Sequence, residues 1–565
     1  MESTSLDFTG LKIPRDYYLH RRRETMTITI LQAVLLGLFC GIAKCCVPYT
    51  AGAFMFNTVI FNAVVVGAVL GDMPQAMIIG ASLQLIYLGV ISAGGNQPSD
   101  PCLAAYIAIP VAMASGLNTT AAVALAVPVG LLGAQITNLI YLMAGFFAQK
   151  GDTFVEKGNA AGMTRWSVIY CAIARIICFG VPVAIALYFG SGALQGVLDN
   201  IPAAVTNGLS AMGACLPAVG FAIIANLISK PKYIPFFFAG FFLIQYTKIG
   251  TIPLLMVGGF LTFLYITFKS NEFQGETDED EDDEDEEEEP AEKLLSKKDI
   301  LKSWVIWWFS AETCHSFERM QAPSFCTSLV PALKKFYPGE ENKPRYIEAL
   351  KRNMTFFNTE AHWGGGPILG LTLALEEKKS RNYEAIPGEV IMNLKTGLMG
   401  PLAGIGDTIS WSTLMYLLIG LFLPLAKKGN PLGGIGPIVL LTVICFGIGY
   451  FLTQKCYTFG YSFAENMLKS GLVNKIIAGA SILGLFMMGG LASTYVTVST
   501  PIKFATSAYT TTLQSIFDSI VPGLLPLIVV LCVWGYLSKV KRNYFAATLG
   551  VTIVSLVLGC LGVII

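Results

Sequence analysis

The stretch Gly71 to Ala105 reads GDMPQAMIIGASLQLIYLGVISAGGNQPSDPCLAA, and it decides the class of fold. Its middle is almost wholly apolar, whereas the segment Gly94 to Pro101 holds two glycines and two prolines, which a regular helix does not accommodate. Non-helical backbone at membrane depth persists only where protein buries it or where it lines a wet cavity. We therefore predict an all-α polytopic membrane protein with broken or re-entrant helices, which is how transporters build substrate sites.

The composition of the whole chain supports a membrane protein. Of its 565 residues 54% are hydrophobic and only 13% are charged, about half the charged share of a soluble domain, and the mean hydropathy is +0.60. A soluble enzyme is therefore excluded. Apolar segments are predicted near residues 26–47, 51–70, 76–93, 102–117, 119–147, 167–189, 210–229, 234–268, 364–375, 396–425, 433–453, 474–498, 520–537 and 543–565.

The charges divide the chain into domains. The net charge is zero, but 13 of the 14 residues from Glu276 to Glu289 are acidic, so the remaining residues carry 25 acids against 38 bases. So acidic a run cannot bury a core and is expected to be a disordered tether. We predict a basic tail (1–25), a membrane domain (26–270), the acidic linker (271–295) and a second domain (296–565), in which an amphipathic region (296–360) precedes membrane segments (364–565).

Lysines on both sides of the acidic run and the arginines of the tail predict the orientation. Lys269 precedes the run and Lys293 follows it, while Arg21 to Arg23 precede the first apolar segment. Cytoplasmic loops are enriched in such bases. We therefore expect a multi-pass protein of the plasma membrane with the tail and the linker in the cytoplasm.

Polar residues in or beside the broken segment of the first half are candidate substrate ligands. They are Asp72, Gln84, Asn96 and Asp100. Amides and carboxylates give the directed hydrogen bonds that a sugar requires, and a polar group inside an apolar segment is costly without a role. The alternative is an extramembrane turn with solvated side chains.

The second half has a similar arrangement. Asn358, Glu360 and His362 precede the Gly364 to Pro367 break, and Asp407 follows a second stretch broken by glycine and proline. Asp407 could instead be a helix N-cap, and His362 a structural imidazole. Two further acids, Glu376 and Glu377, are predicted to form a solvated helix end because two lysines follow them.

Several other chemistries have no support in the sequence. There is no Walker A motif, no GxSxG elbow and no Cys/His set at metal-ligand spacing, so neither ATP hydrolysis, nor a metal, nor a cofactor is predicted. The thirteen cysteines are expected to be buried free thiols. The surplus of bases forms no stripe interleaved with aromatic residues, so nucleic acid is not an expected partner, but an acidic or phosphorylated protein is.

At these motifs the chain resembles a known family. The stretch Gly71 to Ala105 resembles the IIC component of mannose-type sugar permeases of the phosphotransferase system. Four later stretches resemble the IID component: FERMQAPSFCTSLVPALKKFY (Phe317 to Tyr337), FFNTEAHWGGGPILGLTLALEE (Phe356 to Glu377), GLMGPLAGIGDT (Gly397 to Thr408) and GASILGLFMMG (Gly479 to Gly489). The two components, usually separate chains, would here be fused.

The resemblance implies import of a hexose, an amino sugar or a related sugar with concomitant phosphorylation. A phosphohistidine on a soluble IIB partner, itself charged by IIA or within a IIAB protein, would supply the phosphoryl group, because this chain lacks those domains. The resemblance also implies a trimeric homo-oligomer among lipids of the bacterial inner membrane. Asp100 or Glu360 could orient or deprotonate the sugar hydroxyl.

Two departures from the family pattern leave the sugar open. Gln84 stands where mannose and glucose members often have Glu, and the usual Asn-Thr-His-Pro of IID reads Asn358-Thr359-Glu360-Ala361. An amino sugar, an N-acetylated sugar or a sugar–amine conjugate is therefore also a candidate. We expect the sugar site between the two halves of the chain.

Two other classes of function remain open. One is a secondary transporter of a small polar solute, with Asp72, Asp100 or Asp407 as its ion site. The other is a membrane receptor or scaffold that transports nothing.

Overall fold

The structure of the chain, a computed structural model, describes residues 27–87, 99–116, 119–199, 202–228, 231–269, 293–384, 386–470, 473–505, 510–539 and 544–565. The basic tail, Asn96 and nearly all of the predicted tether lie outside these ranges.

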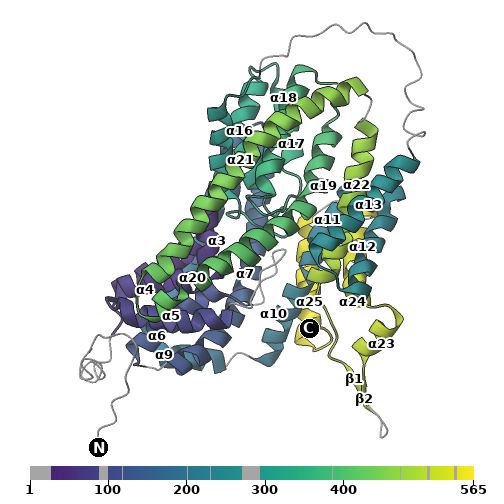
Figure 1. Cartoon of the computed structure of the whole chain (residues 1–565). Helices are drawn as coiled ribbons and strands as arrows, with labels where there is room; N and C mark the ends of the chain where they lie inside the picture. Colours follow the sequence, from purple (N-terminus) through teal and green to yellow (C-terminus); the bar gives the residue numbers. More distant parts are fainter. Residues whose placement is uncertain are drawn as a thin grey trace, which may run out of the picture.

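The described residues form an almost wholly helical protein (Figure 1), which confirms the predicted class of fold. The one sheet described is a short antiparallel pair in which Lys503 lies opposite Thr512. The elements are α2 (Ile30–Lys44), α3 (Tyr49–Asn57), α4 (Ile60–Leu70), α5 (Met73–Tyr87), α6 (Pro101–Ala114), α7 (Thr119–Val155), α8 (Ala160–Thr164), η1 (Arg165–Tyr170), α9 (Cys171–Asp199), α10 (Ala203–Cys215), α11 (Pro217–Ile228), η2 (Pro231–Tyr233), α12 (Ile234–Thr247), α13 (Thr251–Phe268), α15 (Lys297–Ser310), α16 (Ala322–Phe336), α17 (Lys343–Asn353), α18 (Gly365–Arg381), α19 (Gly388–Gly406), η3 (Asp407–Leu414), α20 (Met415–Lys427), α21 (Leu432–Ser470), α22 (Val473–Tyr495), β1 (Lys503–Ala505), β2 (Thr510–Thr512), α23 (Leu513–Ile520), α24 (Leu524–Lys539) and α25 (Tyr544–Cys560).

Several helices are long and apolar enough to cross a membrane. Among the described residues there are four: Pro128–Val155, Ala160–Gly190, Gly388–Lys427 and Leu432–Gly460. Two bent pairs would add two more spans: α2 with α3, bent by 114°, and α23 with α24, bent by 76°. The protein is therefore a multi-pass membrane protein with broken helices, as the glycines and prolines predicted.

The break between α3 and α4 shows how the freed backbone groups are satisfied. The sequence predicted one apolar segment over 51–70, but the helix stops at Asn57 and restarts at Ile60. The Asn62 amide donates to the carbonyls of Met55 and Thr58 at 2.7 Å each. Side chains thus replace the missing helical hydrogen bonds, as membrane-depth breaks require.

The two halves of the chain interleave rather than form two separate bodies. From the first half, α12 packs on α22 of the second half so closely that a Cβ at Gly240 or Gly489 would collide with a carbonyl oxygen of the other helix. In the same way a Cβ at Gly434, near the start of α21, would meet the carbonyl oxygen of Ile60 in α4. Figure 1 shows both contacts as helices of different colour packed together. Helices of the two halves therefore pack directly against each other. We call the boundary between the two halves the seam.

Helices α16 to α18 lie at one end of the structure (Figure 1), and α15 packs against α16 and α21. On α16 the side chains of Leu329, Leu333 and Phe336 are buried, whereas Lys334 and Lys335 are exposed, so the predicted amphipathic pattern is present. The segments on both sides of the acidic run lie at this end. After the run, Leu294 N donates to the Glu377 carboxylate on α18 at 2.8 Å. Before the run, the end of α13 packs beside the start of α22, where a Cβ at Gly479 would meet Ile266.

The start of α2 lies at the other end, near α4 to α6. Helix α2 runs antiparallel to α9, because a Cβ at Gly37 would meet the carbonyl of Gly180 and one at Gly41 would meet Ile176. The last residue of α8 contacts α16: the side-chain oxygens of Thr164 and Thr327 lie 3.2 Å apart. From Thr164 the helical run reaches Gly180 about 24 Å further on, so Gly180, and Gly37 of α2 beside it, lie far from the end formed by α16. This arrangement does not support the expectation that the N-terminal tail and the acidic run share one side of the membrane.

Candidate functional site

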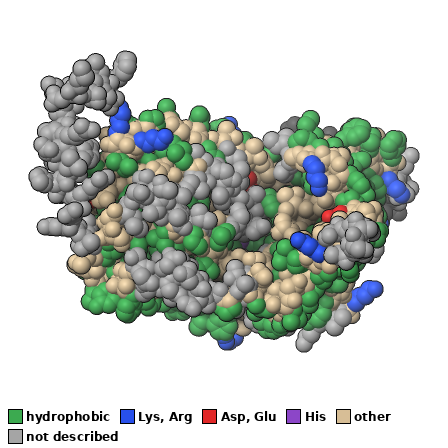
Figure 2. All heavy atoms as spheres, turned by 90° about the horizontal axis from the view of Figure 1, so that it is seen from below, with side chains coloured by type: hydrophobic (Ala, Val, Ile, Leu, Met, Phe, Trp, Pro, Cys, Tyr) green, Lys and Arg blue, Asp and Glu red, His purple; other side chains and the backbone are tan. Residues whose placement is uncertain are grey.

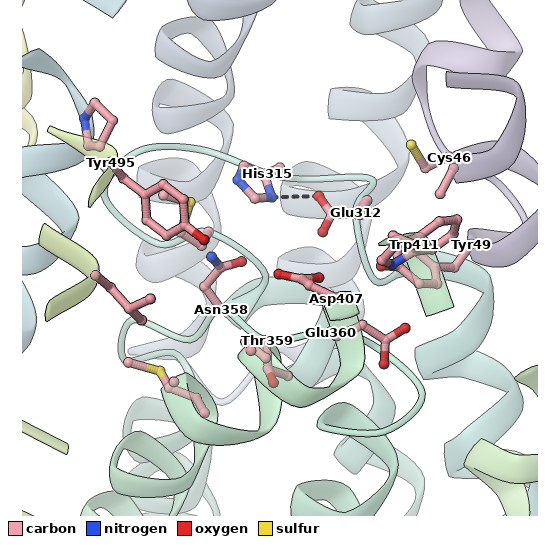
Figure 3. Close-up of a pocket in the computed structure, with 18 of the residues that line it drawn as sticks. Cys46, Tyr49, Glu312, His315, Asn358, Thr359, Glu360, Asp407, Trp411 and Tyr495 are labelled. Carbon is pink, nitrogen blue, oxygen red and sulfur yellow. Dashed lines mark ion pairs between the residues drawn. The ribbon is translucent and has the colours of Figure 1, made fainter. Parts of the chain in front are cut away.

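A cavity of about 160 Å³ lies at the seam between the two halves of the chain (Figure 3). Its polar and aromatic lining comes from both halves. The first half contributes Tyr49, Phe56, Asn57, Tyr141, Arg175 and Phe221, and the second contributes Glu312, His315, Phe356, Asn358, Thr359, Glu360, Asp407, Trp411, Tyr416 and Tyr495. Three of the sequence-predicted residues, Asn358, Glu360 and Asp407, therefore lie in one pocket.

Glu360 is held in a chain of hydrogen bonds that crosses the seam. One carboxylate oxygen lies 2.5 Å from His362 Nδ1, and the His362 Nε2 atom lies 2.7 Å from Thr50 Oγ1 on α3. The Trp308 indole N–H donates to the same hydroxyl at 2.8 Å. Since an ionised carboxylate can only accept, Nδ1 carries the proton. We name this set, Glu360, His362, Thr50 and Trp308, the seam relay.

The backbone completes the environment of Glu360. Its second oxygen accepts from the backbone N–H groups of His362 and Trp363 at 2.9 and 2.7 Å, so both oxygens are occupied. The tight turn that brings these groups to the carboxylate leads directly into α18 at Gly365. His362 is fully buried and does not line the cavity, so its role is to hold Glu360.

A second carboxylate in the pocket is paired with a histidine. Glu312 Oε2 lies 2.5 Å from His315 Nδ1, and the other oxygen accepts from the Gln321 amide at 2.6 Å. Burial alone would raise the pKa of the Glu312 carboxyl, but His315, Gln321 and Arg175 together hold that pKa below its ordinary value. Sequence reasoning did not propose Glu312 or His315 as site residues, although an acid three residues before one of the chain's only three histidines was a visible signal.

Arg175 ties this loop to the first half. Its guanidinium donates to the carbonyls of Glu312 and Thr313 at 2.6 and 3.0 Å and to the carbonyl of Lys44 at 2.8 Å. No feature of the sequence distinguished Arg175 from the arginines that are expected at helix ends. Arg175 therefore positions the pocket wall through both of its Nη atoms, while its Nε donor has no partner among the described residues.

Asp407 is a third, half-buried acid that lines the pocket. It lies within a continuous helical run, at the first residue of the π-helical segment η3, with αR backbone on both sides. The prediction of a helix N-cap is therefore wrong, because the helix does not start there. Figure 3 shows its carboxylate beside Asn358 in the middle of the cavity. Neither side chain has a hydrogen-bond partner among the described residues.

Asp100 does not line this pocket. It accepts from Lys44 Nζ at 2.6 Å, and both side chains are fully buried. Its other oxygen accepts from Leu103 N at 2.9 Å and caps the start of α6. Its geometry thus gives Asp100 an ion pair and a helix cap rather than a substrate contact.

Gln84 and Asp72 also serve helix starts in the first half. Gln84 Oε1 accepts from Val59 N at 2.8 Å and from Ile60 N at 3.1 Å, at the break that precedes α4. Asp72 accepts from Gln75 N at 3.2 Å in the first turn of α5. Asn96 lies outside the described residues.

Gln84 offers a direct test of this assignment. Gln84→Glu should preserve both sugar affinity and stability, because a carboxylate oxygen still accepts from the two N–H groups and is favoured at a helix start. Gln84→Leu should lower stability by about 1–3 kcal/mol for an orphaned donor. Unfolding of the purified protein in detergent and a sugar-binding titration measure these effects. A change of sugar preference in Gln84→Glu would instead return this residue to the substrate site.

Glu376 and Glu377 are buried rather than solvated, so the predicted exposed helix end is wrong. Glu376 pairs with Arg352 at 2.8 Å and accepts from Asn353 at 2.8 Å. Glu377 accepts from the Tyr457 hydroxyl at 2.5 Å and from Leu294 N. The end of α18 is buried because side chains of α17 and α21, which lie elsewhere in the sequence, pack over it and supply hydrogen bonds to both carboxylates.

No group of three or more His, Cys, Asp or Glu side chains is placed to hold a metal ion among the residues that the structure describes. The chemistry available in the pocket is that of hydrogen bonding and aromatic stacking, which suits a small polyhydroxylated solute. A polytopic helical protein with such a pocket at the seam of two halves has the construction of a solute permease.

Comparisons with known proteins identify the kind of permease. Residues 30–264 match the family model described as "PTS system sorbose-specific iic component", and residues 294–564 match "PTS system mannose/fructose/sorbose family IID component". The chain is 38% identical over 233 residues to the mannose-specific EIID component of Escherichia coli K12 (40% of this chain, 81% of the relative). It is 38% identical over 255 residues to the fructose permease IID component of Bacillus subtilis 168 (44% and 90%).

The first half has its own relatives. It is 30% identical over 242 residues to the mannose-specific EIIC component of Escherichia coli K12 (43% of this chain, 90% of the relative).

Among solved structures, a cryo-EM structure of the mannose transporter ManYZ with microcin E492 includes a chain that aligns with about half of this one. The identity is 34% and the TM-score 0.42, over 48% of this chain and 99% of that one.

The protein therefore belongs to the mannose/fructose/sorbose family of phosphotransferase-system sugar permeases and joins the IIC and IID components in one chain. The matches lie on either side of the acidic run.

Proposed function

We propose that the pocket at the seam binds the sugar that this permease imports, and that a soluble IIB phosphohistidine phosphorylates it there. The observation that carries the proposal is that Asn358 and Asp407 present polar side chains to the cavity, whereas the Glu360 and Glu312 carboxylates are already paired with histidines. Carboxylate and amide groups bind sugar hydroxyls directionally, and the rings of Tyr49 and Trp411 offer stacking faces.

In this proposal the residues of the chain position the sugar and the partner brings the phosphoryl group. Transfer requires one hydroxyl in line with the phosphohistidine, with little covalent work for the permease. Asp407 and Asn358 orient the hydroxyls. Glu360 keeps the pocket wall in place through the seam relay, because both of its oxygens are already occupied.

The end covered by α15 to α17 is proposed to face the cytoplasm. Exposed bases gather there, namely Lys297, Lys298, Lys302, Lys334, Lys335, Lys343, Arg345 and Lys351. The opposite end, seen in Figure 2, is mostly hydrophobic and uncharged where its side chains are coloured, with scattered Lys and Arg side chains and a few acidic ones. Since cytoplasmic surfaces carry the basic excess, the acidic linker lies in the cytoplasm and the start of α2 lies on the outer side.

This orientation supports the expected partners. The basic end would attract a soluble IIB or IIAB protein by its charge, and the linker at 271–295 would connect a IIC-like part to a IID-like part. A trimeric homo-oligomer surrounded by lipid in the bacterial plasma membrane completes the proposal.

Sugar uptake into membrane vesicles tests the function. We expect uptake only with phosphoenolpyruvate and the soluble phosphocarriers inside, and the sugar should be recovered as its phosphate. Uptake of unmodified sugar driven by an ion gradient, with no need of the phosphocarriers, would establish the secondary-transporter alternative instead.

A further inference from the structure

One histidine of the pocket has a ring nitrogen that no described residue occupies. His315 lines the cavity and is only 3% exposed. Its Nδ1 atom lies 2.5 Å from Glu312 Oε2, whereas its Nε2 atom has no hydrogen-bond partner among the described residues. Buried polar atoms are normally paired, so an open nitrogen in the wall of a binding cavity indicates a partner that arrives with the ligand.

Glu312 determines which nitrogen of the imidazole is open. Burial acts to raise the pKa of the Glu312 carboxyl, but His315, Gln321 and Arg175 together hold that pKa below its ordinary value. The acid is therefore ionised, and an ionised carboxylate only accepts hydrogen bonds. A neutral His315 consequently carries its proton on Nδ1 and presents the lone pair of Nε2 to the cavity. The same carboxylate stabilises the imidazolium that forms when Nε2 takes up a proton.

Both halves of the chain hold this imidazole in place. From the first half, the Tyr141 ring on α7 lies against it with the two ring centroids 4.7 Å apart, and Arg175 on α9 donates to the backbone carbonyl of Glu312 at 2.6 Å. In Figure 3 the second ring nitrogen of His315 points away from Glu312, toward the side of the cavity where Asn358 lies. A base held in one orientation by an acid is the construction that enzymes use to activate a hydroxyl group.

The acids near the pocket lack this combination. Asp100 is engaged in a buried ion pair and does not line the cavity. Both oxygens of Glu360 already accept hydrogen bonds. The charged groups that act on Asp407 are Glu360 and Glu312, both of them acids, so no base among the described residues orients it. His315 is therefore the described side chain of the pocket that has both an orienting partner and an open acceptor.

We propose that His315 is the general base of the phosphoryl transfer and that Glu312 orients it. The inference rests on the proposed function of the pocket and assigns a residue to its chemistry. One hydroxyl of the sugar donates to His315 Nε2, and as the hydroxyl oxygen forms its bond to phosphorus the proton passes to that nitrogen. The P–N bond of the partner's phosphohistidine breaks, its electron pair returns to the partner's imidazole, and the proton held by His315 is released to that imidazole through water. No other reactant is needed.

Nitrogen NMR of the purified native protein tests the protonation state of His315 without a sugar. The chain has three histidines, so labelling histidine with the heavy nitrogen isotope gives few signals, and the signals lost in His315→Gln belong to His315. At about pH 8, the upper limit of the range in which histidines ordinarily titrate, we expect a neutral ring protonated on Nδ1. A ring protonated on Nε2, or an imidazolium that persists at this pH, would overturn the proposal, because neither form accepts a proton at Nε2.

The rate of sugar phosphorylation then tests catalysis. The assay combines the reconstituted protein, the phosphorylated IIB protein that supports uptake in vesicles, and whichever of mannose, glucosamine, N-acetylglucosamine and fructosyl-lysine is phosphorylated during that uptake. Glutamine keeps a hydrogen-bond acceptor but takes up no proton, so His315→Gln should lower the rate by about 100-fold or more and change the sugar affinity by no more than about fivefold. The matched control, His20→Gln in the N-terminal tail, should keep the native rate.

The pH dependence of that rate distinguishes a base from a structural imidazole. The titratable and charged groups around His315 in the cavity are Glu312 on its own loop, Tyr141 on α7, Arg175 on α9, Asp407 on η3 and Tyr495 on α22. Between about pH 5 and 8 the native rate should rise as Nε2 loses its proton, and the rate of Asp407→Asn should rise as well. In His315→Gln this rise should be absent.

Two outcomes of the rate assay would overturn the assignment. One is a rise with pH that persists in His315→Gln, which would leave the imidazole a structural role, and the other is a rise that disappears in Asp407→Asn, which would make Asp407 the base. If uptake of none of the four sugars required the phosphocarriers, the proposed function would fail instead, and the NMR experiment measures the state of His315 independently of that result.

Discussion

Asp100→Asn is expected to destabilise the protein by about 3–5 kcal/mol, the usual result of removing one partner of a buried ion pair. Lys44 and Asp100 are both fully buried and lie 2.6 Å apart. An asparagine still caps α6 through its side-chain oxygen, so the cap is preserved and the loss reports the ion pair. The ammonium of Lys44, which also lies 3.6 Å from the centroid of the Phe56 ring, would keep only neutral partners.

A second substitution separates the ion pair from a general weakening of the site. Lys44→Met in the Asp100→Asn background removes the stranded charge and should recover most of the lost stability, because replacing both partners by neutral groups is often close to neutral. Unfolding of the purified protein in detergent measures all four combinations. If Asp100→Asn left stability unchanged but abolished sugar binding, Asp100 would be a substrate ligand after all.

Asp100 also shows what the sequence could and could not predict. Its place after a glycine- and proline-rich stretch correctly marked a special aspartate at a helix start. The partner, Lys44, lies 56 residues earlier, inside an apolar segment where a lysine carries no signal of its destination. Sequence patterns report local geometry, but a buried ion pair depends on how distant helices meet.

Some helix limits were predictable, because apolar length and glycine or proline breaks act locally. The predicted segment at 102–117 corresponds to α6, and the predicted start at 433 lies at the start of α21, although α21 continues to Ser470. Tertiary partners were not predictable. The interleaving of α12 with α22 depends on close contacts at Gly240 and Gly489. Glycine is too frequent in this chain, at 57 residues, for such contacts to be chosen from sequence.

The residues of the pocket were predictable only in part. Asn358, Glu360 and Asp407 were identified as polar residues beside broken apolar stretches, and the structure brings them to one cavity. Gln84 and Asp100 satisfied the same criterion and serve helix starts instead. A freed backbone group attracts a polar side chain whether or not a ligand is present, so the criterion selects structural caps as readily as binding residues.

The seam relay gives the second large expected effect. Thr50→Val removes the hydroxyl that lies 2.7 Å from His362 Nε2 and 2.8 Å from Trp308 Nε1. The buried His362 imidazole and the half-buried Trp308 indole lose their partner, and an orphaned buried group costs about 1–3 kcal/mol. We expect a less stable protein with weaker sugar binding, because Glu360 is oriented through His362. Thr50→Ser, which keeps the hydroxyl, should restore both properties.

A double-mutant cycle decides whether the relay acts as one unit across the seam. His362→Phe removes the two ring nitrogens that bridge Thr50 and Glu360, so the loss in Thr50→Val combined with His362→Phe should be smaller than the sum of the two single losses. Residues in one hydrogen-bond network typically couple by about 0.5–3 kcal/mol. Thr50 and His362 are 312 residues apart and belong to the two halves of the chain, so this coupling would measure directly how the IIC-like half holds the pocket of the IID-like half. Strictly additive losses in both stability and sugar affinity would mean that Thr50 only packs against the histidine and that Glu360 is positioned from the second half alone.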